Sequence, residues 1–172
     1  MAGYSGTPLP QKLGIREQHR VWLSAAPEHF LKLLGPLPGT VKLTMSSRGA
    51  PFDVIVQFAT SRAKLASAFE GLKAKLDPAG GLWIAWPKRS SGVATDISED
   101  VVRELALSIG LVDNKVCAID DTWSGLRCVV RLQNRPKPTK KLKAQASSDS
   151  KPPKVRSARA AGSRATRAVP RA

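Results

Sequence analysis

The chain has 172 residues, 42% of them hydrophobic, and its formal net charge is +15. This length suits one ordinary domain with an appendage, which needs neither a metal nor a disulfide to fold. No apolar stretch approaches ~18 residues and the N-terminus lacks an apolar run, so neither a membrane span nor a signal peptide is predicted. The two histidines and two cysteines lack metal-ligand spacing. Cys117 and Cys128 lie in strand-like runs, where we expect small buried thiols in a reducing cytoplasm.

The charge divides the chain near Asn134. Twelve lysines and arginines and a single acid, Asp149, follow this residue, so the last part carries +11. The remaining sixteen basic and twelve acidic residues give the first part a net charge of +4. The last part consists largely of Lys, Arg, Ala, Pro and Ser without apolar periodicity, and it cannot bury enough surface to offset its ordering entropy. We therefore predict a folded domain over residues 1–134 and a disordered basic tail over residues 135–172.

The opening of the domain contains four short elements. A helix is predicted over residues 9–15, followed by a strand over 19–24. Pro27 suits the first turn of a helix over 27–34, because proline lacks the backbone N–H that this position does not need. Alternating apolar residues then indicate a strand over 41–45.

The middle of the domain has a clearer pattern. Residues 53–59 are almost continuously apolar, as in a strand covered on both faces. A helix with one apolar stripe is predicted over 62–76. The sequence DPAGG at 77–81 indicates a turn, and LWIAW at 82–86 a second buried strand.

The end of the domain is predicted to contain one helix and a hairpin. The helix spans 98–109, with Asp96 or Ser98 as its N-cap. Strands over 115–119 and 126–132 are joined by a six-residue loop rich in turn-forming residues.

Strands alternating with helices, followed by an antiparallel hairpin, indicate a mostly parallel sheet with an antiparallel edge. We predict a Rossmann-like three-layer α/β sandwich, whose C-terminal hairpin resembles that of class I methyltransferases. Such folds usually place a glycine-rich turn after the first strand and an acid after the second. Here residues 24–27 (SAAP) contain no glycine and residues 46–48 (SSR) no acid. The sequence therefore predicts this fold without its glycine-rich cofactor loop, and no cofactor.

Three separated stretches resemble one bacterial family. They are GYSGTPL at 3–9 with KLGI at 12–15, WPK at 86–88 with Asp96 and EDV at 99–101, and GLVDNKVCA at 110–118 with WSGL at 123–126. The sequence is thereby similar to the family called domain of unknown function 3052, over essentially the whole of residues 1–134. That family has no assigned activity, so the resemblance implies a fold but no catalytic residues. The tail lies outside its pattern.

In an open α/β sheet, ligands bind beyond the carboxyl ends of the strands. Helix N-termini with nearby cations suit an anion there, which selects a candidate pocket formed by Ser24, Thr60, Ser61, Arg62, Trp86, Lys88, Arg89 and Ser90. The alternative interpretation is that Thr60 or Ser61 only caps a helix and that residues 88–89 form a solvated loop. Trp86 either lines the pocket or packs in the core.

The predicted hairpin loop gathers Asp120, Asp121, Trp123 and Ser124. A carboxylate pair beside an exposed aromatic ring suits acid–base chemistry or a partner surface. In the alternative interpretation, aspartate caps turns and the tryptophan folds back onto the sheet. No histidine or cysteine is placed in the sequence to complete a nucleophilic set, so catalytic residues stay unassigned.

The tail carries cations separated by Pro, Ala and Ser. Proline keeps such a chain extended, and spaced charges follow phosphates, whereas the absence of aromatic residues argues against sequence-specific readout. The alternative is an extension that only solubilises. The cations are Arg135, Lys137, Lys140, Lys141, Lys143, Lys151, Lys154, Arg156, Arg159, Arg164, Arg167 and Arg171.

The leading hypothesis from the sequence is a non-catalytic Rossmann-like domain that binds a small anionic ligand or a partner, with a tail that adds nonspecific nucleic-acid affinity. It depends on the missing glycine turn and on the charge of the tail. The alternative hypothesis is a transferase-like enzyme related to methyltransferases, with an unusual cofactor pocket at residues 60–62 and 86–91.

Overall fold

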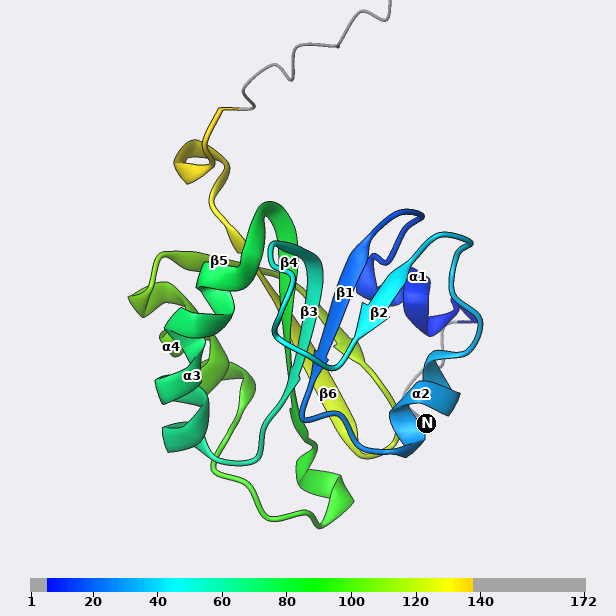
Figure 1. Ribbon diagram of the computed structural model, residues 1–172. Helices are drawn as coiled ribbons and strands as arrows, with labels where there is room; N and C mark the ends of the chain where they lie inside the picture. The colour runs from blue at the N-terminus through cyan, green and yellow to red at the C-terminus, as the bar shows by residue number, and fades with distance from the viewer. Residues whose placement is uncertain (1–5, 138–172) are drawn as a thin grey trace, which may run out of the picture. The chain divides into compact units, whose positions relative to one another are not determined.

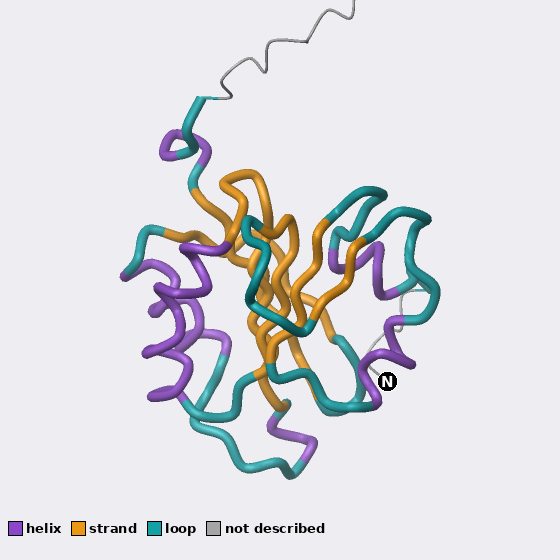
Figure 2. The backbone as a smooth tube through the Cα atoms, viewed as in Figure 1, coloured by secondary structure: helices purple, strands orange, loops and turns teal. Residues whose placement is uncertain are grey.

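Two apolar runs, at residues 52–58 and 82–86, form the centre of a β-sheet in the computed structural model, which describes residues 6–137 (Figures 1 and 2). The strands are β1 (Arg20–Ser24), β2 (Lys42–Thr44), β3 (Phe52–Phe58), β4 (Leu76–Pro87), β5 (Leu111–Ala118) and β6 (Trp123–Val130). The helices are α1 (Leu9–Leu13), α2 (His29–Leu34), α3 (Arg62–Lys75) and α4 (Glu99–Ser108), with the short 3-10 turns η1 (Arg89–Ser91) and η2 (Leu132–Asn134).

The sheet is mostly parallel, as predicted. Its order is β2-β1-β3-β4-β6-β5, in which the first four strands run parallel and β6 is antiparallel to both of its neighbours. The chain builds outward from β1 to β2 and then returns to the other side of β1 with β3. The strand order therefore reverses between β1 and β3. Such a reversal is where open α/β sheets bind ligands, at the carboxyl ends of the strands.

Alternating side chains of the sheet supply two separate cores. Ile55 and Ile84 point toward α3 and α4, whereas Val56 and Trp83 point toward α1 and α2. All four are fully buried, and each such side chain contributes roughly 1.5–3 kcal/mol relative to exposure. Figure 1 shows the two helical layers on opposite sides of the sheet, which confirms the predicted three-layer sandwich.

Serine caps begin the two long helices. Ser61 Oγ accepts from the Lys64 backbone N–H at 3.5 Å, and Ser98 Oγ accepts from that of Val101 at 3.4 Å. Asp96, the other predicted cap of α4, instead accepts from the Arg62 backbone N–H at 2.6 Å. The Asp96 carboxylate thus satisfies an unpaired donor in the first turn of α3 and links this helix to the segment that precedes α4.

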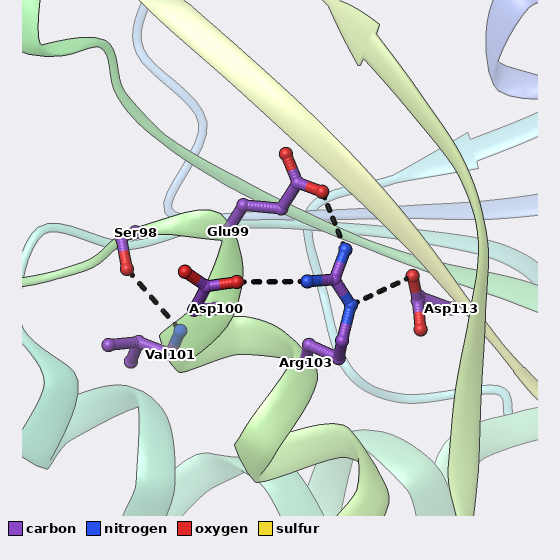
Figure 3. A network of polar contacts seen from close by, with 6 residues as sticks. All are labelled: Ser98, Glu99, Asp100, Val101, Arg103 and Asp113. Carbon is purple, nitrogen blue, oxygen red and sulfur yellow. Dashed lines mark hydrogen bonds and ion pairs between the residues drawn. The ribbon is translucent and has the colours of Figure 1, made fainter.

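Arg103 fixes α4 to the edge strand β5 (Figure 3). Its guanidinium donates to Glu99 at 2.6 Å and to Asp100 at 2.9 Å, both in the first turn of α4, and to Asp113 of β5 at 3.2 Å. The Asp113 carboxylate, followed by that of Glu99, raises the pKa of Arg103 above its usual value. One side chain therefore joins the start of α4 to the neighbouring strand.

The predicted turn at residues 77–81 lies within the first part of β4, where the strand pairing is irregular. Phe52 pairs with Leu76 and Val54 with Gly81, and Asp77 Oδ1 accepts from the Ala79 backbone N–H at 2.8 Å. A Cβ on Gly80 would lie 2.6 Å from the Asp53 carbonyl oxygen, and a Cβ on Gly81 would lie 2.3 Å from Arg127 Nε. Glycine is therefore needed at these two positions because backbone and side-chain atoms of Asp53 and Arg127 approach so closely.

The hairpin boundaries also differ from the prediction. Strand β5 begins at Leu111 and β6 at Trp123, so the connecting loop is residues 119–122 and shorter than predicted. Trp123 belongs to β6, and its ring meets that of Phe58 edge-on at 5.0 Å between centroids. The alternative interpretation, in which this tryptophan folds back onto the sheet, is confirmed.

The chain divides into two units, Met1–Lys137 and Pro138–Ala172. The first extends three residues past the predicted boundary at Asn134, because η2 and the bond from Arg135 Nε to the Val130 carbonyl hold the chain near β6. The predicted basic tail lies almost entirely outside the described residues. Within residues 6–137, no helix has the length and apolar character needed to cross a membrane.

Candidate functional site

The loops that follow β1, β3 and β4 meet at one edge of the sheet, the lower edge in Figure 1. A cavity of about 240 Å³ lies there, beside the reversal of strand order between β1 and β3. Its wall comprises Ala25 of the β1–α2 loop, residues 57–61 at the end of β3, and Lys64, Leu65 and Ala68 of α3. We call it the carboxyl-edge pocket.

Ala25 shapes the turn after β1. Its φ is 52°, in the left-handed region that glycine adopts at little cost and other residues at about 1–2 kcal/mol. The turn therefore contains one residue in a backbone conformation that favours glycine, although the sequence places alanine there. This conformation cannot be read from the letters SAAP alone.

The polar groups of the pocket wall come mainly from β3 and the start of α3. Gln57 Nε2 donates to the Phe58 carbonyl at 2.7 Å, which fixes the side-chain amide at the strand end. Ser61 provides the cap of α3, so its structural interpretation is confirmed. The backbone carbonyl of Thr60 accepts from Thr95 Oγ1 at 2.8 Å. The exposed cation of the wall is Lys64, which the sequence analysis did not select.

The structure brings Thr60 and Ser61 to this pocket but none of the predicted cations. Arg62 forms an ion pair with Glu104 at 3.2 Å, and Lys88 Nζ donates to the Asp120 carbonyl at 2.6 Å. Trp86 is 7% exposed and packs in the core beneath α3 and α4. The other candidates are Ser24, half-buried at the end of β1, and Arg89 and Ser90, exposed in η1.

A histidine–aspartate pair lies at the same edge of the sheet. His29, the first residue of α2, places Nε2 3.0 Å from Asp120 Oδ2 in the β5–β6 loop. The other oxygen, Oδ1, accepts from the backbone N–H groups of Thr122 and Trp123 at 2.8 and 2.6 Å. Asp120 is therefore held in place while His29 stays accessible, with 57% of its side chain exposed.

Because an ionised carboxylate only accepts hydrogen bonds, this contact places the ring proton of neutral His29 on Nε2. Nδ1 then has a lone pair, and within residues 6–137 it has no hydrogen-bond partner. Such an arrangement suits proton abstraction. The sequence analysis missed it because 91 positions separate the two residues. Within the same residues, no cluster of three His, Cys, Asp or Glu side chains suits a metal ion.

The mostly parallel sheet places this chain among the open α/β proteins. Proteins of this class bind ligands where the strand order reverses, which is the position of the carboxyl-edge pocket. Among solved structures, the fold is similar to a SAM-dependent methyltransferase from Aquifex aeolicus, with TM-score 0.52 and 15% identity over 70% of this chain and 87% of that chain. It is also similar to a Sulfolobus solfataricus protein assigned to the type 11 methyltransferases, with TM-score 0.51 and 14% identity over 76% and 94%. The chain thus has the class I methyltransferase fold.

These similarities correct two interpretations. The leading hypothesis of a non-catalytic binding or interaction domain is wrong, since the neighbours in fold are methyltransferases and favour the transferase-like alternative. The prediction of no cofactor is also wrong, since the Aquifex aeolicus protein is SAM-dependent. Neither a family model nor a curated protein matches the sequence. Membership of the domain of unknown function 3052 family therefore stays a prediction.

Proposed function

We propose that the chain is a methyltransferase that binds S-adenosylmethionine (SAM) at the carboxyl-edge pocket. The observation that carries this proposal is the position of the pocket, at the reversal of strand order in a class I methyltransferase fold. In open α/β sheets this is the place where a nucleotide-like cofactor meets loops and helix N-termini. Ala25, whose backbone is left-handed, brings the first loop to the wall of this pocket.

The fit of the pocket to SAM is partial. Its volume of about 240 Å³ lies below the ~300–1,000 Å³ of most small-molecule sites, so part of the cofactor would stay at the open rim. Thr60, Ser61 and the Gln57 amide are the polar groups of the wall that would hold the cofactor. Lys64 adds a cation that suits its carboxylate.

When bound, SAM supplies an activated methyl group to a nucleophile on the acceptor. The residues of this chain would orient that acceptor and take up its proton. His29 is the candidate general base, because Asp120 holds its ring and Nδ1 is available to accept. The loop contacts from Lys88 to Asp120 and Thr122 join this pair to the carboxyl end of β4. The pair thus belongs to the same edge as the pocket.

Thermal unfolding of the full chain with SAM, and with its demethylated product S-adenosylhomocysteine, tests the proposal. We expect both to raise the midpoint. Ala68→Leu places a larger side chain in the pocket wall and should abolish the shift, whereas Ala66→Leu, on the exposed part of α3, should preserve it. Absence of a shift in the unmodified protein, or equal shifts in both variants, would contradict a cofactor site at this pocket.

We also propose that the basic tail contacts nucleic acid without sequence preference. The support is the distribution of charge, since the tail carries +11 of the total +15. Each phosphate neutralised releases counterions, so the logarithm of affinity should fall steeply with the logarithm of salt concentration. Duplex DNA binding is compared between the full chain and a chain ending at Lys137. Equal affinity and equal salt dependence would contradict the proposal.

A further inference from the structure

A second cavity, of about 510 Å³, lies away from the carboxyl edge. It opens between α1, the loop after it and the first residues of β3 and β4, and therefore at the amino ends of these strands. Lys115 of β5 and Arg127 of β6 complete its wall, side by side in the strand register. We call this cavity the basic pocket.

The charge of the basic pocket is strongly one-sided. Four of its lining residues are cationic at neutral pH, namely Lys12, Arg16, Lys115 and Arg127. Asp53 is the one acid in its lining, and its carboxylate accepts from the Arg20 backbone N–H at 2.8 Å. His19 adds a further donor, because its Nδ1 accepts from the Arg16 backbone N–H at 3.2 Å, which leaves the proton of the neutral ring on Nε2.

Among the described residues, Arg127 is the cation of the pocket that has a buried donor without a partner. Its Nε is buried and has no hydrogen-bond partner within residues 6–137, and Nη1 reaches Asn114 Oδ1 only at 3.4 Å. No carboxylate in this part of the chain pairs with the guanidinium. Burial, followed by the charges of Arg135 and Arg16, lowers its pKa. A buried donor on an uncompensated cation is costly, since water can satisfy the N–H but does not neutralise the charge.

The backbone of β4 accommodates this arginine. A Cβ on Gly81 would lie 2.3 Å from Arg127 Nε and 2.7 Å from its Cζ, so the guanidinium lies directly against the backbone of Gly81. Any larger residue at position 81 would displace it. The absence of a side chain at Gly81 therefore sets the position of Arg127 at the wall of the pocket.

We propose that the basic pocket binds the phosphate group of a small phosphorylated molecule. Arginine and lysine are the side chains that bind phosphate oxygens through charge-assisted hydrogen bonds. A cavity of about 510 Å³ lies within the usual size of small-molecule sites, so it also has room for an organic group attached to the phosphate. The proposal does not depend on the methyltransferase assignment, because this pocket and the carboxyl-edge pocket share no lining residue.

Isothermal titration of the full chain with inorganic phosphate and with ribose 5-phosphate, in chloride buffer of fixed ionic strength, tests this site. We expect saturable binding of at least one of them. Arg127→Gln should weaken it by about tenfold or more, as for loss of a hydrogen bond to a charged group. Arg131→Gln is the matched control, because Arg131 is exposed just after β6 and lies outside the pocket lining; this variant should bind within about twofold of the unmodified chain.

A second pair of variants tests the geometry with the charge unchanged. Gly81→Ala should displace the guanidinium and weaken binding, whereas Gly71→Ala, in open space on α3, should leave it unaltered. Thermal unfolding without ligand establishes that every variant is folded. Since all variants carry the tail, any binding of phosphate by the tail is common to them.

Three results would overturn the proposal. The first is the absence of saturable binding of either phosphate. The second is an equal loss in Arg127→Gln and Arg131→Gln, which would indicate diffuse charge rather than a site. The third is a loss of duplex DNA affinity in Arg127→Gln with small phosphates unaffected, which would make the pocket part of a nucleic-acid surface.

Discussion

His29 Nε2 lies 3.0 Å from Asp120 Oδ2, which joins the start of α2 to the loop between β5 and β6 across 91 positions of sequence. The two members of this pair differ in their structural role. Asp120 also accepts from the backbone N–H groups of Thr122 in its own loop and of Trp123 at the start of β6. Within residues 6–137, the His29 side chain has no other hydrogen bond.

Because of this difference, we expect replacement of Asp120 and of His29 by alanine to lower the free energy of unfolding by different amounts. Asp120→Ala should lower the free energy of unfolding by about 1–3 kcal/mol, because two backbone donors lose their acceptor. His29→Ala should cost no more than about 1 kcal/mol, as expected for an exposed ion pair. Urea unfolding measures both, with Asp121→Ala of the same loop as the control, expected within about 0.5 kcal/mol of the unmodified chain. A larger loss for His29 than for Asp120 would contradict the assigned roles.

Two buried tryptophans should respond differently to replacement by phenylalanine. Trp83 Nε1 donates to the Leu13 carbonyl at 2.9 Å, whereas Trp22 Nε1 is buried without a partner within residues 6–137. Trp83→Phe should destabilise by about 1–3 kcal/mol beyond the loss of volume, since a buried carbonyl loses its donor. Trp22→Phe removes an unsatisfied donor and should cost clearly less. Chemical denaturation compares the two, and equal losses would show that Trp22 Nε1 is in fact satisfied.

Ala25 provides a prediction about backbone strain at the carboxyl-edge pocket. Because its φ is 52°, Ala25→Gly should leave stability unchanged or raise it by up to about 1 kcal/mol. The neighbouring Ala26 packs partly buried against the core below α2, so Ala26→Gly should lower stability by about 0.5–1 kcal/mol. Thermal unfolding of the two variants shows whether each substitution raises or lowers stability. A loss in Ala25→Gly as large as in Ala26→Gly would exclude strain at this turn.

Cys128 makes stability depend on alkaline pH. Burial, with a smaller contribution from Asp113, raises the pKa of its thiol to about 12, above the 9.0 of an unperturbed thiol. Between these values the unfolded chain loses the thiol proton and the folded chain keeps it, so stability is fully present below about pH 9 and falls as the pH rises toward 12.

The slope from this one proton is at most about 1.4 kcal/mol per pH unit. Cys128→Ala should therefore flatten the loss of stability between pH 9 and pH 11, whatever its effect at neutral pH. Cys117→Ala should flatten it less, because the pKa of Cys117 is raised by a smaller burial that Lys115 opposes. Identical slopes in Cys128→Ala and the unmodified chain would contradict a buried, protonated thiol.

Local sequence signals predicted most of the fold. The apolar runs that became β3 and β4 are buried on both faces, and hydroxyl caps at Ser61 and Ser98 begin the helices as expected. The close approach of Asp53 and Arg127 to Gly80 and Gly81 was not predicted, because a glycine that permits close approach has the same letter as one that forms a turn.

The candidate site was only partly predictable. The rule that ligands bind at carboxyl ends selected Thr60 and Ser61, which line the carboxyl-edge pocket, since strand ends follow from local patterns. It could not show that Arg62 pairs with Glu104 and that Lys64 faces the pocket, because these depend on how helices pack. The basic pocket could not be predicted for the same reason, since its cations come from three separate segments of the chain.

The most direct test of the account is an amide NMR titration of the full chain with S-adenosylhomocysteine, which reports both the affinity and the location of binding. We expect saturable shifts centred on the amides of Ala25, Gln57 and Ser61, with Asp53 and Arg127 of the basic pocket unaffected. Shifts that do not saturate, or that centre on the basic pocket, would contradict a cofactor site at the carboxyl ends of β1 and β3.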